Sequence, residues 1–323
     1  MDDVTKAKKY IQSLKNENKP DAEPLIIDCD PGIDDAMALL LLSDNLDKYD
    51  VKLICSCAGN TPIDITTQNM QFFAENFFPG VRIAKGSRTA LVKNNPRNAD
   101  DVHGKSGMGA YEVGPQTYPV EPDAIVAMAD VLRNSEKPVT LVTLGPLTNV
   151  AKVVIMYPEL KEKIKEVYTM IGSIKGEGNI TSYAEFNSYY DPESFDLVVK
   201  SGVKLIINPM ELGNETRIPK TSFAKMKTTS LRDNFVKVLA ESINETVDPT
   251  SVCVYDPNTI VGMVKPELYD FIPCNINVYT APKVGGKTVI TEDPNGKHLY
   301  QKAKNYEHLQ TFILRALFGK EEY

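Results

Sequence analysis

Four aspartates stand within eight residues near the start of the chain: Asp28, Asp30, Asp34 and Asp35. They directly follow the apolar run 24–27, and a Pro-Gly pair supplies a sharp turn between the first two and the last two. Four unpaired carboxylates this close together repel one another and raise one another's pKa values. A hard cation such as Ca²⁺, which takes six to eight oxygen ligands, removes that penalty. The spacing therefore predicts a cation site.

Other roles are open to these aspartates. Asp34 and Asp35 alone would suit the first turn of a helix, where the helix dipole favours negative charge. An EF-hand does not fit, because the twelfth residue counted from Asp28 is Leu39 rather than Glu. A Mg²⁺-dependent phosphatase with Asp28 as its aspartyl nucleophile is an alternative, although no small hydroxyl residue follows Asp30 within three positions.

Further polar clusters come directly after other apolar runs or inside polar loops. They are Ala58-Gly-Asn60, Gly145-Pro-Leu-Thr-Asn149, Gly178-Asn179, Ala184-Glu-Phe-Asn187 and Asp256-Pro257. Side-chain amides and carboxylates that converge suit a ligand dense in hydroxyl groups, because each hydroxyl both donates and accepts. Taken singly, a Gly-Asn pair is typical of a turn and Asp256 of a helix N-cap.

The elements that must position these residues alternate between short apolar runs and amphipathic stretches. Expected strands are 24–28, 51–57, 81–85, 139–144, 167–171 and 203–208. Expected helices are 33–46, 64–78, 124–134, 147–156, 192–200, 223–243, 257–264 and 309–318. This alternation predicts an α/β protein with an open, mostly parallel, doubly wound (Rossmann-like) sheet and helices on both faces. Residues 276–279 and 288–291 are expected to add a C-terminal hairpin.

Two long polar loops, 86–119 and 173–191, interrupt the pattern. In such sheets ligands bind beyond the carboxyl ends of the strands, where the aspartates and most of the polar clusters fall. Residues 1–23 form a polar extension, with one loose helix expected through Lys15, and residues 24–323 are expected to form a single domain.

Composition excludes several classes of protein. The chain has 323 residues, 42% of them hydrophobic and 24% charged, with a net charge of −7. Without a basic block, this balance argues against a nucleic-acid or anionic membrane partner. No apolar run reaches the roughly 18 residues that a transmembrane helix needs. Five scattered cysteines suggest reduced thiols and a cytoplasmic location.

Taken together, the motifs resemble the inosine–uridine-preferring nucleoside hydrolase family. The segment Asp28-Cys-Asp-Pro-Gly-Ile-Asp-Asp35 matches the family's N-terminal fingerprint almost letter for letter. Supporting motifs occur in family order from about Leu25 to the end of the chain. They are Ala58-Gly-Asn60, His103-Gly104, Leu144-Gly-Pro-Leu-Thr-Asn149, Gly178-Asn179, Ala184-Glu-Phe-Asn187, Asp191-Pro-Glu193 and Asp256-Pro257.

The resemblance implies a nucleoside hydrolase fold and one Ca²⁺ per subunit at the bottom of the pocket. Its protein ligands would be Asp30, both oxygens of Asp35, Asp256 and the backbone carbonyl of Leu144. Asp30 would also deprotonate the attacking water held by the metal. Ca²⁺ is weakly polarising, so a neighbouring carboxylate must take that proton. Asp28 resembles a residue that orients the loop.

The ribose hydroxyl groups would be held by a second set of residues. The resemblance assigns this role to Asp34, Asn179, Glu185, Asn187 and Asp256, with Asn60 supporting the metal and its water. Cleavage of an N-ribosidic bond develops positive charge on the sugar, as in glycoside hydrolysis. Carboxylates around the ribose stabilise that charge.

The residues facing the base depart from the family pattern. Tyr255 stands where many members have a histidine that donates a proton to the leaving base, and a phenol with a pKa near 10 matches that task poorly at pH 7. His103, in the loop 86–119, is a candidate to contact the base or its leaving nitrogen; a solvent-facing loop histidine is the alternative. Ile171 stands roughly where a methionine often lines the base pocket, and Met170 adjoins it. The base pocket itself is expected from the loop 86–119 and the region 223–243.

The leading interpretation is a Ca²⁺-dependent ribonucleoside hydrolase that releases free base and ribose for nucleoside salvage. Broad or purine-including specificity is expected, together with a homodimer or homotetramer. The alternatives are a nucleoside- or ribose-binding protein that keeps the metal without turnover, and the phosphatase described above.

Overall fold

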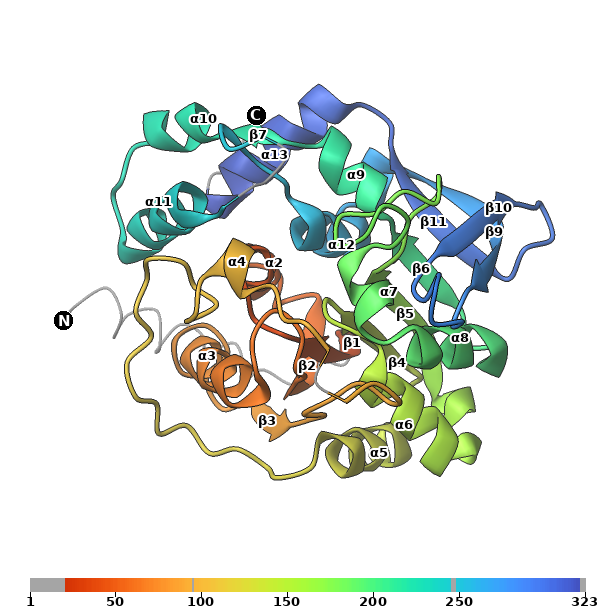
Figure 1. Ribbon diagram of the computed structural model, residues 1–323. Helices are drawn as coiled ribbons and strands as arrows, with labels where there is room; N and C mark the ends of the chain where they lie inside the picture. Colours follow the sequence, from red (N-terminus) through yellow and green to blue (C-terminus); the bar gives the residue numbers. More distant parts are fainter. Residues whose placement is uncertain (1–20, 95, 245–247, 320–323) are drawn as a thin grey trace.

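The computed structural model describes residues 21–94, 96–244 and 248–319 (Figure 1). The helix expected through Lys15 lies outside these residues. Among the described residues, no helix is long and apolar enough to cross a membrane.

A nine-stranded, mostly parallel sheet runs through the molecule in the order β10-β9-β11-β6-β5-β4-β1-β2-β3 (Figure 1). The central strands are continuous apolar runs, as expected for strands buried on both faces. The strands are β1 (Glu23–Cys29), β2 (Tyr49–Ser56), β3 (Arg82–Lys85), β4 (Val139–Thr143), β5 (Ile164–Met170), β6 (Leu205–Asn208), β9 (Tyr269–Val278), β10 (Thr288–Glu292) and β11 (His298–Ala303). β7 (Ile218–Pro219) and β8 (Ser251–Val252) form a separate two-stranded ribbon.

Helices cover both faces of the sheet, which confirms the predicted fold class. They are α2 (Ile33–Ser43), α3 (Ile63–Asn76), α4 (Asp100–His103), α5 (Ala124–Asn134), α6 (Thr148–Met156), α7 (Phe186–Tyr190), α8 (Pro192–Ser201), α9 (Met210–Glu215), α10 (Lys220–Lys225), α11 (Leu231–Ser242), α12 (Tyr255–Val264) and α13 (Tyr306–Leu317), with 3₁₀ turns at Pro158–Lys163 and Pro266–Leu268. Side chains of β1 alternate between two cores. Leu25 and Ile27 pack with α2, α3, α11, α12 and α13, whereas Ile26 packs with α5, α6 and α8.

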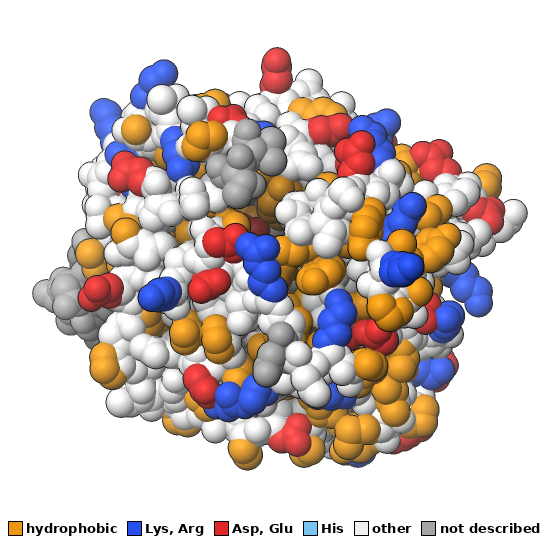
Figure 2. All heavy atoms as spheres, in the orientation of Figure 1, with side chains coloured by type: hydrophobic (Ala, Val, Ile, Leu, Met, Phe, Trp, Pro, Cys, Tyr) orange, Lys and Arg blue, Asp and Glu red, His pale blue; other side chains and the backbone are white. Residues whose placement is uncertain are grey.

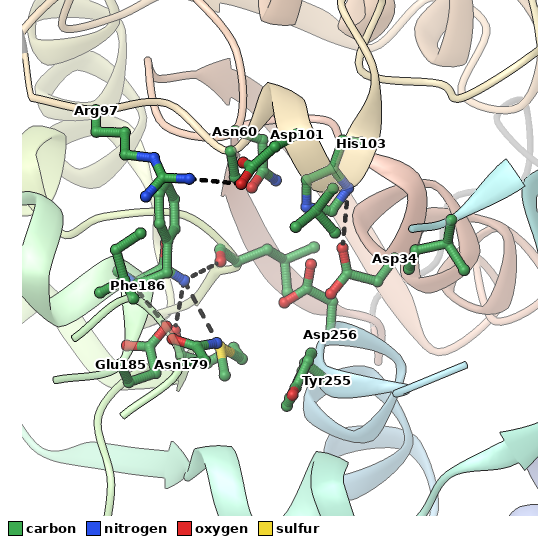
Figure 3. Close-up of a pocket in the computed structure, with 17 residues that line it drawn as sticks. Asp34, Asn60, Arg97, Asp101, His103, Asn179, Glu185, Phe186, Tyr255 and Asp256 are labelled. Carbon is green, nitrogen blue, oxygen red and sulfur yellow. Dashed lines mark hydrogen bonds and ion pairs between the residues drawn. The ribbon is translucent and has the colours of Figure 1, made fainter. Parts of the chain in front are cut away.

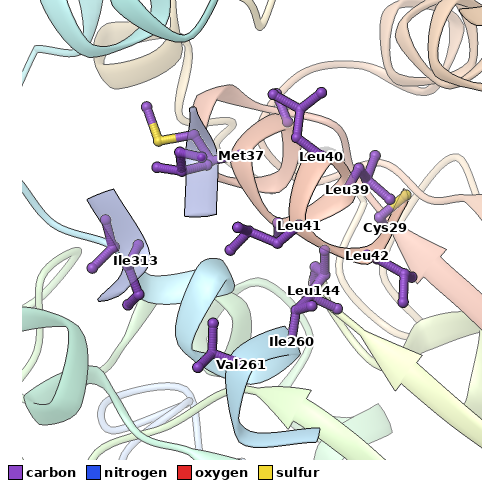
Figure 4. Packing of buried hydrophobic residues seen from close by; sticks show 14 of the residues in the cluster. Cys29, Met37, Leu39, Leu40, Leu41, Leu42, Leu144, Ile260, Val261 and Ile313 are labelled. Atoms are coloured by element: carbon purple, nitrogen blue, oxygen red, sulfur yellow. The ribbon is translucent and has the colours of Figure 1, made fainter. Parts of the chain in front are cut away.

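α2 is buried along almost its whole length, from Ile33 to Leu42. It packs against α12, with Leu41 and Ile260 in the same apolar cluster (Figure 4). A helix that is buried all round cannot turn a polar residue towards bulk solvent. Asp34 and Asp35, in its first turn, are therefore held inside the protein at the carboxyl edge of the sheet.

Several predicted elements differ from the structure. The predicted helix 223–243 is two helices, α10 and α11, because a Ser230–Asp233 capping box starts a new helix after residues 226–230. The polar loops contain short helices, α4 in the first and α7 in the second. The C-terminal hairpin is confirmed as β9 and β10, but the sequence analysis missed β11, which pairs antiparallel with β9 and parallel with β6.

Candidate active site

A cavity of about 330 Å³ opens at the carboxyl edge of the sheet (Figure 3). This volume lies at the lower end of the range for small-molecule sites. The structure brings nine of the predicted site residues to its lining: Asp34, Asn60, His103, Leu144, Asn179, Glu185, Asn187, Tyr255 and Asp256. They come from segments between positions 34 and 256, so only the folded sheet brings them together.

The floor of the cavity is a cluster of carboxylates, of which Asp34 and Asp256 line the cavity and Asp35 does not. Asp34 and Asp35 come from the first turn of α2 and Asp256 from the first turn of α12, and one oxygen of each lies within 4.8 Å of the others. All three are buried. Burial, followed by the charge of Asp34, raises the pKa of Asp35 to about 6. Burial and the charges of Asp34 and Asp35 raise the pKa of Asp256 well above its usual range.

Asp30 lies behind this cluster, is only 1% exposed and is not among the residues lining the cavity. Its Oδ2 accepts a hydrogen bond from the backbone N–H of Asn60 at 2.7 Å, and its Oδ1 has no hydrogen-bond partner among the described residues. Burial and the charge of Asp35 raise its pKa well above the usual range. Two glycines make room for this carboxylate, since a Cβ atom would lie 1.9 Å from Oδ2 at Gly59 and 2.5 Å from Oδ1 at Gly145.

Asn60 ties the two ends of the acidic loop together. Its side-chain amide donates to Asp35 Oδ2 at 2.9 Å and to the carbonyl of Asp30 at 3.1 Å. The backbone N–H of Gly32 also donates to Asp35 Oδ2, at 3.0 Å. These bonds fix the orientation of the Asp35 carboxylate before any ligand enters.

Asp28 does not line the cavity either. Its Oδ1 accepts a hydrogen bond from the amide of Asn149 at 2.8 Å, while its Oδ2 has no partner among the described residues. Burial raises its pKa to about 7. The Asp28 carboxylate thus bonds to Asn149, which does not line the cavity, whereas the Asp30 carboxylate bonds to Asn60, which does.

The donor set of the floor fits a hard divalent cation. All of its ligand atoms are oxygens, and within the described part of the chain the buried Oδ1 of Asp30 has no hydrogen-bond partner. The carbonyl of Leu144 accepts one hydrogen bond, from the Asn187 amide at 2.7 Å, which leaves it a second lone pair. The tightest cluster includes Asp34, which the sequence analysis assigns to ribose, rather than Asp30.

One wall of the cavity comes from α7. Glu185 caps this helix and accepts hydrogen bonds from the backbone N–H groups of Gly172, Asn187 and Ser188 at 2.7–3.0 Å. These bonds lower the pKa of Glu185, but burial is the larger effect and raises it to about 7. The amide of Asn187 is held by the carbonyls of Leu144 and Met170.

His103 lies at the end of α4, buried and against the start of α2. Its Nδ1 accepts a hydrogen bond from the backbone N–H of Ile33 at 3.1 Å and lies 4.0 Å from Asp34 Oδ1. A neutral His103 with this bond carries its proton on Nε2. The alternative of a solvent-facing histidine is therefore wrong.

Tyr255 lines the cavity, but its hydroxyl group donates a hydrogen bond to Asn214 Oδ1 at 2.8 Å. The ring packs directly against Gly213, where a Cβ atom would lie 2.1 Å from it. The phenol proton is thus directed towards the protein rather than towards a ligand.

Ile171 is a correction to the predicted site. It is fully buried in the core on the α5–α6–α8 face and does not line the cavity, whereas Met170 does. Both regions expected to form the base pocket contribute to the cavity: Arg97, Ala99, Asp101 and Val102 come from the first loop and Ile243 from the end of α11. Of these residues the sequence analysis singled out none. Phe186 and Ile180 complete the apolar part of the lining.

Comparisons with known proteins agree with this architecture. The sequence model of the family described as inosine-uridine preferring nucleoside hydrolase matches residues 25–313. The non-specific ribonucleoside hydrolase RihC of Salmonella enteritidis PT4 is 34% identical over 270 residues, which cover 82% of this chain and 87% of that protein. The structure of a plant nucleoside hydrolase superposes with a TM-score of 0.83 at 24% identity, covering 91% of this chain and 98% of the plant chain. A purine-preferring ribonucleoside hydrolase from Gardnerella vaginalis gives a TM-score of 0.82 at 22% identity, covering 93% and 99% of the two chains.

Proposed function

The chain belongs to the inosine-uridine preferring nucleoside hydrolase family, and we propose that its cavity hydrolyses the N-glycosidic bond of ribonucleosides to free base and ribose. The family resemblance drawn from the Asp28–Asp35 motif is thereby confirmed. The observation that carries the proposal is the floor, where buried carboxylates converge beneath a wall of amide and carboxylate groups suited to a sugar.

We infer that the floor holds one Ca²⁺ per subunit. The residues that would hold it are Asp30, Asp35, Asp256 and the carbonyl of Leu144, with Asp34 close enough to contribute. When bound, such a cation keeps these carboxylates ionised and lowers the pKa of a water molecule at the site.

Asp30 is the general base of the proposed reaction. Its buried Oδ1 has no hydrogen-bond partner among the described residues, so this oxygen can accept the proton of a water molecule. The proton of the attacking water passes to Asp30 as the water oxygen forms a bond to C1′ of the ribose. The C1′–N bond breaks at the same time, and its electron pair leaves with the base, which must gain a proton.

The wall stabilises the sugar during this step. Glu185, Asn187, Asn179 and the floor residues Asp34 and Asp256 bind the ribose hydroxyl groups. Their carboxylates also face the positive charge that develops on the ring. Because the backbone N–H groups fix Glu185 in advance, little reorganisation accompanies the charge.

His103 is the proposed donor to the departing base. The hydrogen bond from Ile33 leaves its proton on Nε2, and the residue lines the cavity. Tyr255 contributes its ring to the wall, since its hydroxyl proton is directed to Asn214. Broad or purine-including specificity fits an apolar lining built from Met170, Phe186 and Ile243.

We propose a homodimer or homotetramer, which light scattering on a sizing column measures directly. The five cysteines are free thiols, which fits a reducing compartment such as the cytoplasm.

Ribose release tests the proposed function. The purified protein is incubated separately with inosine, adenosine, guanosine, cytidine and uridine, and free ribose is measured by its reducing end. We expect ribose from at least one nucleoside and no phosphate from nucleoside monophosphates. If nucleosides bind but no ribose appears, the protein is a binder and the proposal is wrong.

A further inference from the structure

A paired arginine and aspartate line the cavity without a role in the reaction described above. Arg97 Nη2 lies 2.5 Å from Asp101 Oδ2, and both side chains are about half exposed, at 59% and 50%. Figure 3 shows the pair at one end of the cavity, on the far side from Tyr255. Figure 2 shows charged and hydrophobic side chains lying beside one another around the middle of this face.

The pair is held in place relative to the floor. The backbone N–H of Ala99 donates to the carbonyl of Asn60 at 3.0 Å, and the Asn98 amide donates to the carbonyl of Gly59 at 2.6 Å. From the other side, the Asn244 amide donates to the carbonyl of Asp101 at 3.1 Å. The segment that carries Arg97 is therefore anchored to the residues that orient Asp30 and Asp35.

Arg97 and Asp101 can break their mutual ion pair and bind a ligand instead with only a small loss of free energy. Exposed ion pairs contribute only about 0.2–1 kcal/mol. Among the residues that the structure describes, the Arg97 guanidinium makes no further hydrogen bond or ion pair, so most of its N–H groups are available. The Tyr255 hydroxyl and His103 Nδ1, by contrast, are already hydrogen-bonded to Asn214 and Ile33.

We propose that Arg97 and Asp101 recognise the base of a 6-oxopurine ribonucleoside, so that the enzyme prefers inosine and guanosine. This inference rests on the proposed function. The parallel N–H groups of a guanidinium match the adjacent O6 and N7 acceptors of a 6-oxopurine. The Asp101 carboxylate accepts from the neighbouring N1–H. Adenine replaces O6 with an amino donor, and pyrimidines lack N7, so both lose part of this match.

The same contact supports bond cleavage. The departing base carries the electron pair of the broken C1′–N bond until it is protonated. A guanidinium beside O6 and N7 stabilises that negative charge but does not give up its own proton, because its pKa lies above 12. Arg97 thus acts by binding the base, and His103 or solvent supplies the proton.

Substitution of Arg97 tests the proposal. Initial rates are measured for the wild type, Arg97→Ala, Arg97→Lys and Asp101→Asn with inosine, guanosine, adenosine, uridine and 4-nitrophenyl riboside, whose leaving group has neither base edge. Arg97→Ala should lower kcat/KM for inosine and guanosine by about tenfold to hundredfold. It should change the value for the nitrophenyl riboside by less than about threefold. Arg97→Lys keeps the charge but not the parallel N–H groups of the guanidinium, so it should restore little of the lost kcat/KM.

Arg88→Ala is the matched control, because Arg88 lies in the same loop, is exposed and pairs with Asp64 outside the cavity. It should match the wild type with every substrate. An equal loss with all substrates on replacing Arg97, or no loss with inosine, overturns the proposal. A wild type that releases ribose from none of the substrates, including the nitrophenyl riboside, overturns the proposed function itself.

Discussion

The floor and the mouth of the cavity differ in burial, in charge and in the elements that carry their residues. The floor carboxylates are buried, come from strand ends and first helical turns, and have pKa values raised by burial and by one another. The mouth consists of Arg97 and Asp101, which are half exposed and hold opposite charges already in contact. Arg97 precedes the short helix α4, and Asp101 lies in it. Holding the floor carboxylates together without a cation therefore costs free energy. Breaking the exposed ion pair at the mouth costs little, so these two side chains can rearrange around a ligand.

The difference indicates which residues determine the reaction itself and which determine the choice of substrate. The sheet fixes the floor, because Asp30, Asn60 and Leu144 follow β1, β2 and β4 at the same edge. Changes there should affect every substrate alike. Changes at the mouth should alter the choice among substrates while leaving the reaction intact.

The largest expected effect comes from the floor. Asp30→Asn keeps the size of the side chain but removes the base, and it should lower kcat by about a thousandfold for every nucleoside. Steady-state rates of ribose release measure the loss. Asp28→Asn is the matched control, because Asp28 is equally buried but bonds to Asn149 rather than to Asn60 at the cavity, and its loss should be much smaller. An equal or larger loss in Asp28→Asn would contradict the assignment of Asp30.

The second effect is on the stability of the metal-free protein, which should depend on pH. Burial raises the pKa of Asp35 from 3.8 to about 6 and that of Asp28 from 3.8 to about 7. A carboxyl group whose pKa is higher in the folded state stabilises the fold in its protonated form. That stability is complete below about pH 4 and is lost as the pH rises through 6 and 7. The metal-free protein should therefore melt at a lower temperature at pH 8 than at pH 5.

Calcium should reverse this loss. At a hundredfold excess over its dissociation constant, a bound ion adds about 2.7 kcal/mol, or roughly 5 °C in melting temperature. Scanning calorimetry should show a larger calcium shift at pH 8 than at pH 5, because the ion binds the ionised carboxylates. Asp256→Asn should reduce the shift, and Asp64→Asn, an exposed control, should keep it. A calcium shift that does not depend on pH would be inconsistent with a carboxylate floor.

The smallest effect is expected at Tyr255, which lines the cavity on the far side from the mouth. Tyr255→Phe removes a hydroxyl group that donates to Asn214, so kcat for inosine should change by less than about threefold. Single-turnover and steady-state rates with inosine measure it. A tenfold or greater loss specific to purines would make the phenol the donor to the leaving base and would displace His103 from that role.

The floor was largely predictable from the sequence, and the mouth was not. Apolar runs mark the strands, and the residues that follow Cys29, Ser56 and Thr143 must meet at one edge of a parallel sheet. Arg97 and Asp101 lie in the segment 86–119, whose sequence shows no periodicity and whose short helix α4 was not predicted, and nothing in their types distinguishes them from other exposed charged residues.

Two errors have simple physical origins. Strand β5 ends at Met170, one residue before the predicted end, and neighbouring residues at a strand end point to opposite faces, so Met170 rather than Ile171 reaches the cavity. The sequence does indicate the break between α10 and α11, through the Ser230–Asp233 capping box. The periodic apolar residues of 223–243 nevertheless favoured one continuous helix.

The most direct test of the proposed cation site is a calcium titration of the metal-free protein, in which both the heat of binding and the rate of ribose release are measured. Titration calorimetry at pH 8 should give one Ca²⁺ per chain in the wild type and much weaker binding in Asp256→Asn, and ribose release should rise in proportion to the occupied fraction. Full ribose release by the metal-free protein, or wild-type calcium binding in Asp256→Asn, would contradict the claim that the acidic floor is a cation site on which the reaction depends.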